Sequence, residues 1–430
     1  SGFDTAVRVD WHIATDAAFR NIVGSGDFRT HAERDYTVNV IAANLEPGQQ
    51  YFYQFSVGQT FSPSGQTKTL PRGRLEQLTI AVATCSNFPF GFFNAYEDIA
   101  NDASIDVVVH LGDYIYEYSQ FGYGGEAGKS IGRMHEPAHE IVSLADYRQR
   151  HAQYKSDVGS RAMHARHPLI AIWDDHETAN NPWMGGAQNH QADEGSWQAR
   201  RSASMTAYYE WMPIRTPEVG APRENYWRHF KFGDLVSLIT LESRHTGRDV
   251  QIDYGDLTRF DSASDAQAFY ADVVGAPERN FLSAEMESFL STELGESVES
   301  GRRWRVIGNQ SILAKMITPS LQAPLFAGLR DKLDNYTRRL LDTLTQLGEF
   351  GVPDDLDSWS GYPAARERFF ETSQNAGASD LLVLSGDSHS YWANTLQNDR
   401  GESMGVELGS TGITSPSSRL AFGDEGVHEF

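Results

Sequence analysis

The spacing of apolar residues changes character near residue 73 of the 430-residue chain. Before that point apolar and polar residues alternate in Tyr36–Val40, and an aromatic run, Tyr51–Phe55, follows a turn at Pro47-Gly48. Alternation is typical of strands that bury one face, and Pro-Gly is a strong turn signal. We therefore expect a small β-sandwich over residues 1–73, with a plain hairpin inside a larger sheet as the alternative.

After residues 71–74, short apolar runs are separated by longer helical patterns, which is the rhythm of an α/β fold. We place a domain boundary there and expect residues 74–430 to form the larger unit. Ser143, with Asp146 three residues later, predicts the start of a helix. Apolar residues at helical spacing predict two further helices, over Glu194–Met212 and Ser283–Leu294.

Five apolar runs of the larger unit each lead to residues that are costly to bury. In α/β sheets ligands bind beyond the carboxyl ends of the strands, so polar groups placed there converge on one crevice. Carboxylates gathered without cations would raise each other's pKa, and a bound metal removes that cost. Each motif alone fits a turn or a helix cap equally well, but all five together favour a shared metal site. The runs are Thr79–Thr84 before Cys85, Val107–Leu111 before Gly112-Asp113, Leu169–Trp173 before Asp174-Asp175-His176, Trp304–Ile307 before Gly308-Asn309-Gln310, and Leu381–Ser385 before Gly386-Asp387-Ser388-His389.

The candidate ligands divide by chemical softness. A thiolate, a phenolate and an imidazole suit a transition metal, whereas carboxylate and amide oxygens suit a hard cation. Two unlike metals bridged by one carboxylate can clamp both the attacking and the leaving oxygen of an in-line displacement, and phosphoryl transfer most needs this arrangement. The residues are Cys85, Tyr116 and His389 for the first kind, Asp175, Asp387 and Asn309 for the second, and Asp113 as the bridge.

Composition narrows the range of partners. Acidic residues outnumber basic ones 58 to 36, and the net charge of −22 disfavours a stable nucleic-acid complex or an anionic membrane surface. A phosphate ester is also anionic, so an enzyme of this charge needs bound cations to reverse the local field. The one cysteine allows no intrachain disulfide, and the longest apolar runs are too short for a membrane span. We expect a soluble protein and make no prediction of its oligomeric state.

Three of the motifs resemble, in type and in order, the metallophosphoesterase motifs GDxxY, GNHE and GHxH. Purple acid phosphatases carry such motifs, but the chain is more similar to the PhoD-type alkaline phosphatases, in which a cysteine replaces the usual first aspartate. The N-terminal domain of that family resembles fibronectin type III, as Leu45–Tyr53 does here. The matching motifs are Gly112–Tyr116, Asp174–Glu177 and Gly386–His389, and further similar stretches are Gly308–Gln310, Ser358–Pro363 and Ile413–Ser417.

The resemblance implies an α/β fold of four layers, namely the metallophosphoesterase sandwich of two mixed sheets flanked by helices. A small fibronectin-III-like β-sandwich would precede it at the N-terminus. It also implies the metals. Fe(III) would be held by Cys85, Asp113, Tyr116 and His389, and Asp113 would reach across to calcium. Calcium, expected in more than one copy, would be held by Asp175, Asp387 and Asn309.

The same resemblance implies His176 and Asp113 as the catalytic residues. Members of the family are exported, so we expect a secreted or periplasmic protein in its mature form without a signal peptide. Leu241–Arg244 stands where the family pattern Asp-x-Arg is expected, which leaves the roles of Glu242 and Arg244 open.

The expected function is that of a metal-dependent alkaline phosphatase. It would hydrolyse small phosphate monoesters, and diesters as well, through a metal-bound hydroxide. The alternatives are a strict phosphodiesterase or nuclease on the same fold, or a non-catalytic surface binding protein whose metals are structural. Gly401–Gly405 matches the serine-hydrolase pattern GxSxG, but a polar stretch precedes it and a strand-like run follows, which disfavours a serine mechanism.

Overall fold

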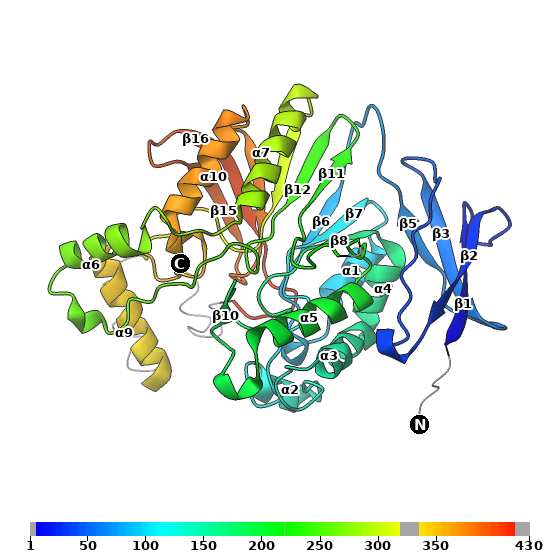
Figure 1. Cartoon of the computed structure of the whole chain (residues 1–430), viewed down its shortest axis with the longest axis horizontal. Helices are drawn as coiled ribbons and strands as arrows, with labels where there is room; N and C mark the ends of the chain where they lie inside the picture. Colours follow the sequence, from blue (N-terminus) through cyan, green and yellow to red (C-terminus); the bar gives the residue numbers. More distant parts are fainter. Residues whose placement is uncertain (1–5, 219, 319–334, 418–430) are drawn as a thin grey trace.

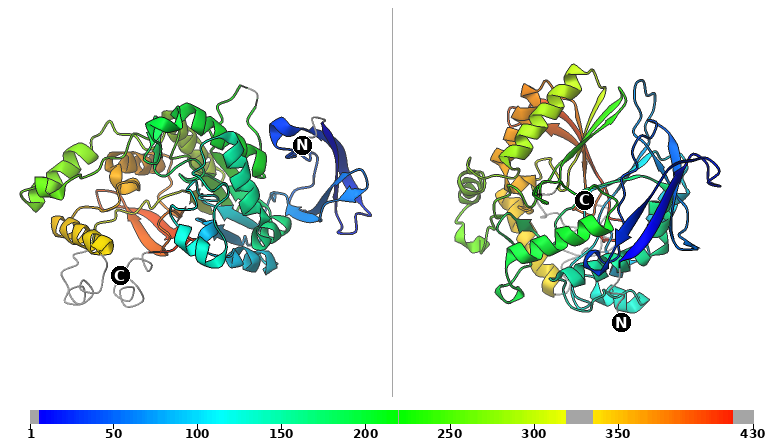
Figure 2. Two further views of the ribbon diagram at one scale, coloured as in Figure 1. Left: turned by 90° about the horizontal axis from the view of Figure 1, so that it is seen from below. Right: turned by 45° about the vertical axis from the view of Figure 1, so that its right-hand side comes forward.

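The computed structural model describes residues 6–218, 220–318 and 335–417. Figure 1 shows an N-terminal sheet at one end of the molecule, a central body of two sheets with helices, and a helical projection of α6 and α9 at the other end. The view from below in Figure 2 places the N-terminal sheet and this projection on opposite sides of the central body.

The N-terminal sheet is antiparallel. Its five strands have the order β2-β1-β3-β4, and β5 pairs with β3. Within the described residues, regular sheet structure in this region is limited to these strands. The domain boundary at residue 73 stays a prediction. The strands are β1 (Val7–Ala14), β2 (Ile22–Thr30), β3 (Gln50–Val57), β4 (Thr60–Phe61) and β5 (Gly65–Lys68).

The strand predicted over Tyr36–Val40 is wrong. Tyr36 has a left-handed backbone with φ of 56°, and the residues after it form no ladder. Instead the Asn39 side chain donates to the carbonyl oxygen of Tyr209 at 2.8 Å, in helix α5 (Trp197–Trp211). The alternation in sequence thus belongs to an extended segment that is bound to a helix, which alternation alone cannot distinguish from a strand.

The central body contains two sheets. The first has three parallel strands in the order β6-β7-β8, and the second is mixed, with six strands in the order β11-β12-β13-β14-β16-β15. Each predicted apolar run forms a strand. The strands are β6 (Ile80–Ala83), β7 (Val107–His110), β8 (Leu169–Ala171), β11 (Arg228–Phe232), β12 (Val236–Thr240), β13 (Trp304–Gly308), β14 (Leu381–Ser385), β15 (Trp392–Gln397) and β16 (Ser403–Gly409), with a short hairpin of β9 (Pro182–Trp183) and β10 (Gly186–Ala187).

The three predicted helices are present. Ser143 and Asp146 form a capping box at the start of α3, and the other two begin after Ser196 and Ser283, whose hydroxyls accept backbone N–H groups. Within the described ranges no helix is long and apolar enough to cross a bilayer. Besides α5 the helices are α1 (Asn94–Asn101), α2 (Gly125–Ile131), α3 (Leu144–Ser156), α4 (Val158–Arg166), α6 (Ala263–Phe269), α7 (Ala284–Glu299), α9 (Asn335–Phe350) and α10 (Pro363–Asn375).

Successive side chains of the larger sheet point to opposite faces, so each face packs against a different layer. Leu238 and Val306 join the core shared with the smaller sheet, while their neighbours Ile239 and Ile307 join a second core formed with α7 and α10. On the far side of the smaller sheet, side chains of α1, α3, α4 and α5 complete the first core. The order helix, sheet, sheet, helix confirms the predicted four layers (Figures 1 and 2).

A glycine in the larger sheet tests this packing. Gly405 in β16 has φ of 126°, and a Cβ atom there would lie 2.0 Å from the carbonyl oxygen of Leu381 in β14. We expect Gly405→Ala to lower the free energy of unfolding by about 2–4 kcal/mol. Gly295→Ala is the control, because a Cβ at this position of α7 meets no atom within 4 Å and alanine favours a helix by roughly 1 kcal/mol. Urea unfolding of both variants measures the difference, and equal stabilities would contradict this packing.

Candidate active site

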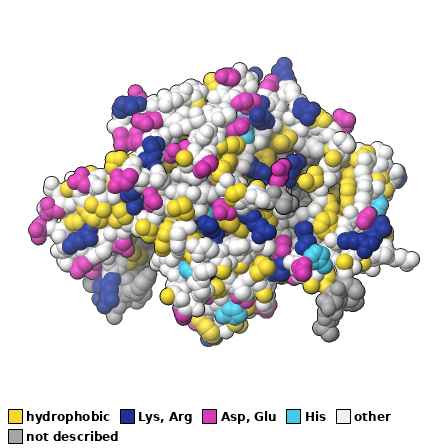
Figure 3. Space-filling view, viewed as in Figure 1, with side chains coloured by type: hydrophobic (Ala, Val, Ile, Leu, Met, Phe, Trp, Pro, Cys, Tyr) yellow, Lys and Arg dark blue, Asp and Glu magenta, His cyan; other side chains and the backbone are white. Residues whose placement is uncertain are grey.

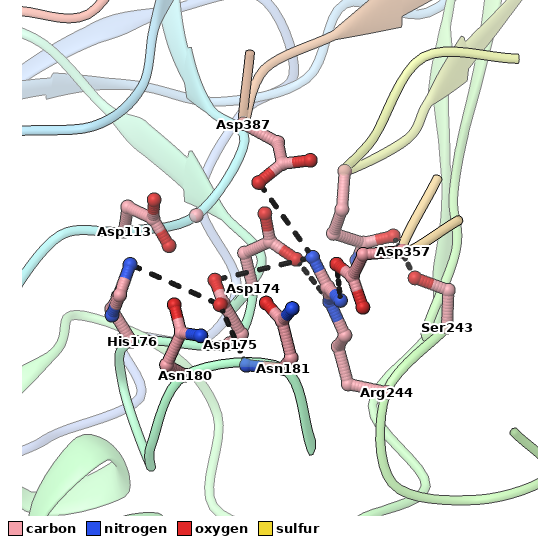
Figure 4. Close-up of polar contacts among 12 residues, drawn as sticks. Asp113, Asp174, Asp175, His176, Asn180, Asn181, Ser243, Arg244, Asp357 and Asp387 are labelled. Atoms are coloured by element: carbon pink, nitrogen blue, oxygen red, sulfur yellow. Dashed lines mark hydrogen bonds and ion pairs between the residues drawn. The ribbon is translucent and has the colours of Figure 1, made fainter. Parts of the chain in front are cut away.

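Side chains from the ends of both central sheets converge on Asp113. It follows β7 and belongs to three groups of possible metal ligands whose donor atoms lie within 4.8 Å of one another. Figure 4 shows the side chains of Asp113, Asp174, Asp175, His176 and Asp387 gathered in one place from separate segments of the chain. The groups are Cys85 with Asp113 and His389; Asp113 with Asp175 and His176; and Asp113 with Asp174, Asp175 and Asp387.

The backbone at this cluster is unusual. Four of the predicted ligands adopt left-handed φ values although none is glycine: 57° at Cys85, 56° at Asp113, 62° at Asp387 and 57° at His389. Such conformations cost about 1–3 kcal/mol each and persist where the surrounding structure imposes them. Here each residue follows a strand end and turns its side chain toward the same crevice, so the strain serves to gather the donors.

The donors predicted for a transition metal surround one oxygen of Asp113. Asp113 Oδ2 lies 3.4 Å from Cys85 Sγ and 3.0 Å from the Tyr116 hydroxyl, which in turn lies 3.2 Å from His389 Nε2. Burial, and then the charge of Asp113, raises the pKa of both the Cys85 thiol and the Tyr116 phenol. The pKa increases mean that without a cation these groups stay protonated, whereas a metal would favour the ionised ligands.

A second set of donors consists of carboxylates. The side chains of Asp113, Asp174 and Asp175 are buried and Asp387 is half-buried. One oxygen of each buried carboxylate, Asp113 Oδ1, Asp174 Oδ2 and Asp175 Oδ1, has no hydrogen-bond partner among the described residues. Burial raises the pKa of Asp174 to about 6 and that of Asp113 and Asp387 well above the usual range. Unsatisfied, buried carboxylate oxygens fit a cation site, because a hard cation satisfies them directly.

Arg244, whose role the sequence left open, lies at the edge of these carboxylates. Its buried guanidinium donates to Asp174 and to Asp357 at 2.5 Å each, and Nη2 lies 3.8 Å from Asp387. Glu242 has a different role, since its carboxylate accepts the backbone N–H of Arg244 at 2.9 Å. Glu242 therefore shapes the loop that carries Arg244, and Arg244 offsets part of the negative charge.

Glu177, the last residue of the Asp174–Glu177 motif, joins the two strand ends. Its carboxylate accepts the backbone N–H groups of Asp113 at 3.1 Å, Tyr114 at 2.6 Å and Asp174 at 2.8 Å. A carboxylate that accepts several N–H bonds holds a backbone turn in place. Glu177 thus fixes the distance between the turns after β7 and β8.

His176 lies next to the carboxylates on the side opposite Arg244 (Figure 4). Its Nδ1 lies 2.7 Å from Oε2 of buried Glu117, and its Nε2 lies 3.9 Å from Asp175 Oδ2. Burial disfavours the imidazolium, but the charges of Asp175 and Glu117 outweigh it and raise the pKa of His176. The arrangement leaves Nε2 facing the cluster, where it can donate a hydrogen bond.

Asn309, the remaining predicted ligand, bonds to protein groups. Its Oδ1 accepts the indole N–H of Trp359 at 3.2 Å, and its Nδ2 donates to the Ser385 hydroxyl at 3.3 Å. Its role as a ligand stays a prediction. Asn181 contacts the carboxylates directly, because its backbone N–H donates to Asp175 Oδ2 at 3.0 Å (Figure 4).

Sequence reasoning missed Glu117, Asn181 and Asp357. Glu117 directly follows the Gly112–Tyr116 motif, and Asp357 precedes the Ser358–Pro363 stretch, so position beside a motif was the one available signal. The serine-hydrolase pattern, by contrast, forms no elbow, because Ser403 is exposed and is the first residue of β16.

Comparison with known proteins identifies the family. The family profile described as PhoD-like phosphatase matches residues 80–426, and the profile of its N-terminal domain matches residues 2–71. The chain belongs to the PhoD-like phosphatase family. Among curated proteins it is similar to alkaline phosphatase D of Bacillus subtilis (strain 168), with 34% identity over 417 residues. That alignment covers 95% of this chain but 64% of the relative, so the chain spans just under two thirds of its length.

A solved structure of the family has the same architecture. The structure described as "Structure of PhoD" superposes with a TM-score of 0.78 at 32% identity. The match covers 100% of this chain and 76% of that chain. The predicted family and fold class are thereby confirmed.

The hydrogen bonds of Glu177 give a test of the site's framework. Glu177→Gln replaces one acceptor oxygen by an amide donor, so the backbone N–H groups that it holds lose an acceptor. We expect the free energy of unfolding to fall by about 1–3 kcal/mol. Glu299→Gln, the same change at an exposed site at the end of α7, should change it by less than about 0.5 kcal/mol. Urea unfolding of the two variants measures this, and similar stabilities would count against the bracing role of Glu177.

Proposed function

We propose that the protein is a phosphoric ester hydrolase of the alkaline phosphatase type, acting on small phosphate monoesters and on diesters. The observation that carries this proposal is the position of Asp113 between two clusters of side chains. One cluster contains the Cys85 thiol, the Tyr116 phenol and the His389 imidazole, and the other consists of carboxylates. A carboxylate shared in this way suits a pair of unlike cations held a few ångströms apart. Membership of a phosphatase family supports the same conclusion.

The residues present fit the metals that the family resemblance implies. Cys85, Tyr116 and His389 would hold Fe(III) on one side of Asp113, and Asp175 and Asp387 would hold calcium on the other. Bound cations would supply an activated water molecule and offset the charge that develops on the phosphoryl oxygens. Asp113 Oδ1 and Asp175 Oδ1 support this assignment, because without a cation these buried oxygens have no hydrogen-bond donor among the described residues.

Side chains around the proposed cations would position the substrate and the ligands. His176 is held through Nδ1 by Glu117, so its Nε2 is oriented to donate a proton or a hydrogen bond to a substrate oxygen. Arg244 holds Asp174 and keeps the carboxylate group from spreading apart. Tyr116 stacks on the His176 ring with 4.2 Å between centroids, which restricts the imidazole to this orientation.

The rival functions differ in their requirements for charge. A nuclease needs a basic track for the phosphate backbone, whereas the net charge here is −22, and basic and acidic side chains are interspersed on the face in Figure 3. A strict phosphodiesterase on the same fold would hydrolyse diesters alone, and a binding protein with structural metals would show no turnover. For localisation we propose a secreted or periplasmic protein, on the basis of the family resemblance.

Metal content and colour test the ligand assignment. Metal analysis of the purified protein should find iron and calcium together. Since a phenolate or thiolate bound to Fe(III) absorbs visible light by charge transfer, Tyr116→Phe combined with Cys85→Ser should bleach the protein. A calcium chelator should abolish hydrolysis of an aryl phosphate. Zinc as the sole metal, or activity that survives the chelator, would overturn the assignment.

A single substitution tests the bridging carboxylate. Asp113→Asn keeps the side-chain volume but removes the charge shared by both ligand groups, so turnover of an aryl phosphate monoester should fall by at least about 1,000-fold. Asp261→Asn, the same change at an exposed position, should leave turnover unchanged. Rates with a matched aryl monoester and diester on metal-analysed protein distinguish the phosphatase from a strict diesterase. Full activity in Asp113→Asn would contradict the mechanism.

A further inference from the structure

A pocket lies away from the candidate metal ligands, where the N-terminal sheet meets α3 and α4. Its volume is about 200 Å³, and none of the candidate metal ligands lines it. The two parts are joined across it by the Tyr53 hydroxyl, which donates to the carbonyl oxygen of His164 at 3.2 Å, and by the Gln66 amide, which donates to that of Arg166 at 2.8 Å. The lining residues are Tyr53, Pro63, Ser64 and Gly65 from the sheet, Lys155 from α3, and Ser160, Arg161, His164 and Ala165 from α4.

Lys155 lies in this pocket without a counter-charge. Its ammonium group lies 3.0 Å from the Tyr114 hydroxyl, 2.9 Å from His164 Nε2 and 3.5 Å from Met212 Sδ, and 4.3 Å from the centre of the Tyr114 ring. All of these partners are neutral, and no carboxylate within the described ranges forms an ion pair with Lys155. Asp157, two residues away, is paired with Arg133 at 3.0 Å and caps α4. An ammonium group in such surroundings is costly unless an anion accompanies it.

The other polar groups of the pocket are also suited to an anion. Arg161 lines its mouth and is exposed, and the Ser64 and Ser160 hydroxyls can donate hydrogen bonds. Among the residues that the structure describes, no acidic side chain lines the pocket. Burial lowers the pKa of Lys155 to about 7, and an anion bound beside it would favour the charged ammonium.

We propose that this pocket is a binding site for a small tetrahedral oxyanion such as phosphate or sulfate. Lys155 and Arg161 would supply the positive charges, and the two serine hydroxyls would supply further donors. The volume limits the ligand, because pockets for drug-sized molecules measure roughly 300–1,000 Å³. A single oxyanion fits this space, and a nucleotide does not.

Calorimetric titration of the metal-loaded protein with inorganic phosphate tests the proposal. The wild type should show a binding event that is independent of the metal cluster. Arg161→Gln should weaken this event by about tenfold, and Ser64→Asp, which places a carboxylate in the pocket, should abolish it. Both positions are exposed, so the variants should fold. Arg303→Gln, the same charge change at an exposed site away from the pocket, should leave binding unchanged.

Titration with sulfate distinguishes binding in this pocket from binding at the candidate metal ligands. Both oxyanions should bind in the pocket, and the sulfate event should respond to Ser64→Asp and Arg161→Gln as the phosphate event does. Hydrolysis of an aryl phosphate by Arg161→Gln at wild-type rate would show that the metal cluster is intact in this variant. The proposal is overturned if every binding event of the wild type persists unchanged in both variants, or if neither anion binds.

Discussion

The repulsion between carboxylates that the fold brings together is the constraint on which the rest of the site depends. Asp113, Asp174, Asp175 and Asp387 have donor oxygens within 4.8 Å of one another. At such separations each pair of charges repels by about 4 kcal/mol even at an effective dielectric constant near 20. Arg244 supplies one positive charge, which cannot balance them all. The framework therefore has to hold the group together, and the cations that we propose would offset the remaining charge.

Hydrogen bonds to the backbone and the conformation of the turns hold these carboxylates together, more than side-chain packing does. Glu177 binds the turns after β7 and β8 to one another through three N–H groups. Gly112 allows the same two turns to touch, since a Cβ at this position would lie 2.3 Å from Asp174 Cβ. The left-handed backbone of Asp113 and of Asp387 then directs both carboxylates inward. The strain at these turns and the repulsion between the carboxylates are costs that the surrounding sheets have to offset.

The sequence predicted the parts of this structure that depend on local pattern. Five of the strands were visible as apolar runs, and the polar residues after them indicated ligands, because parallel strands deliver their ends to one edge. The equally buried strand β12 was not among the predicted runs. The strand at Tyr36–Val40 failed because Asn39 bonds to α5, a contact that its local sequence does not encode. For the same reason Arg244 and Asp357 could not be assigned, since they lie 113 residues apart and their ion pair exists only in the folded protein.

The Gly112–Tyr116 motif illustrates how one short segment serves two sites. Asp113 and Tyr116 face the candidate metal ligands, whereas the Tyr114 side chain extends to the other side. There its hydroxyl meets Ser160, His164 and the ammonium of Lys155, while its backbone N–H is held by Glu177. A change of charge at Lys155 would thus act on Tyr114, whose neighbour Asp113 is the proposed bridging carboxylate. The N-terminal sheet, which closes the pocket through Tyr53, is in this way connected to the turn that positions Asp113.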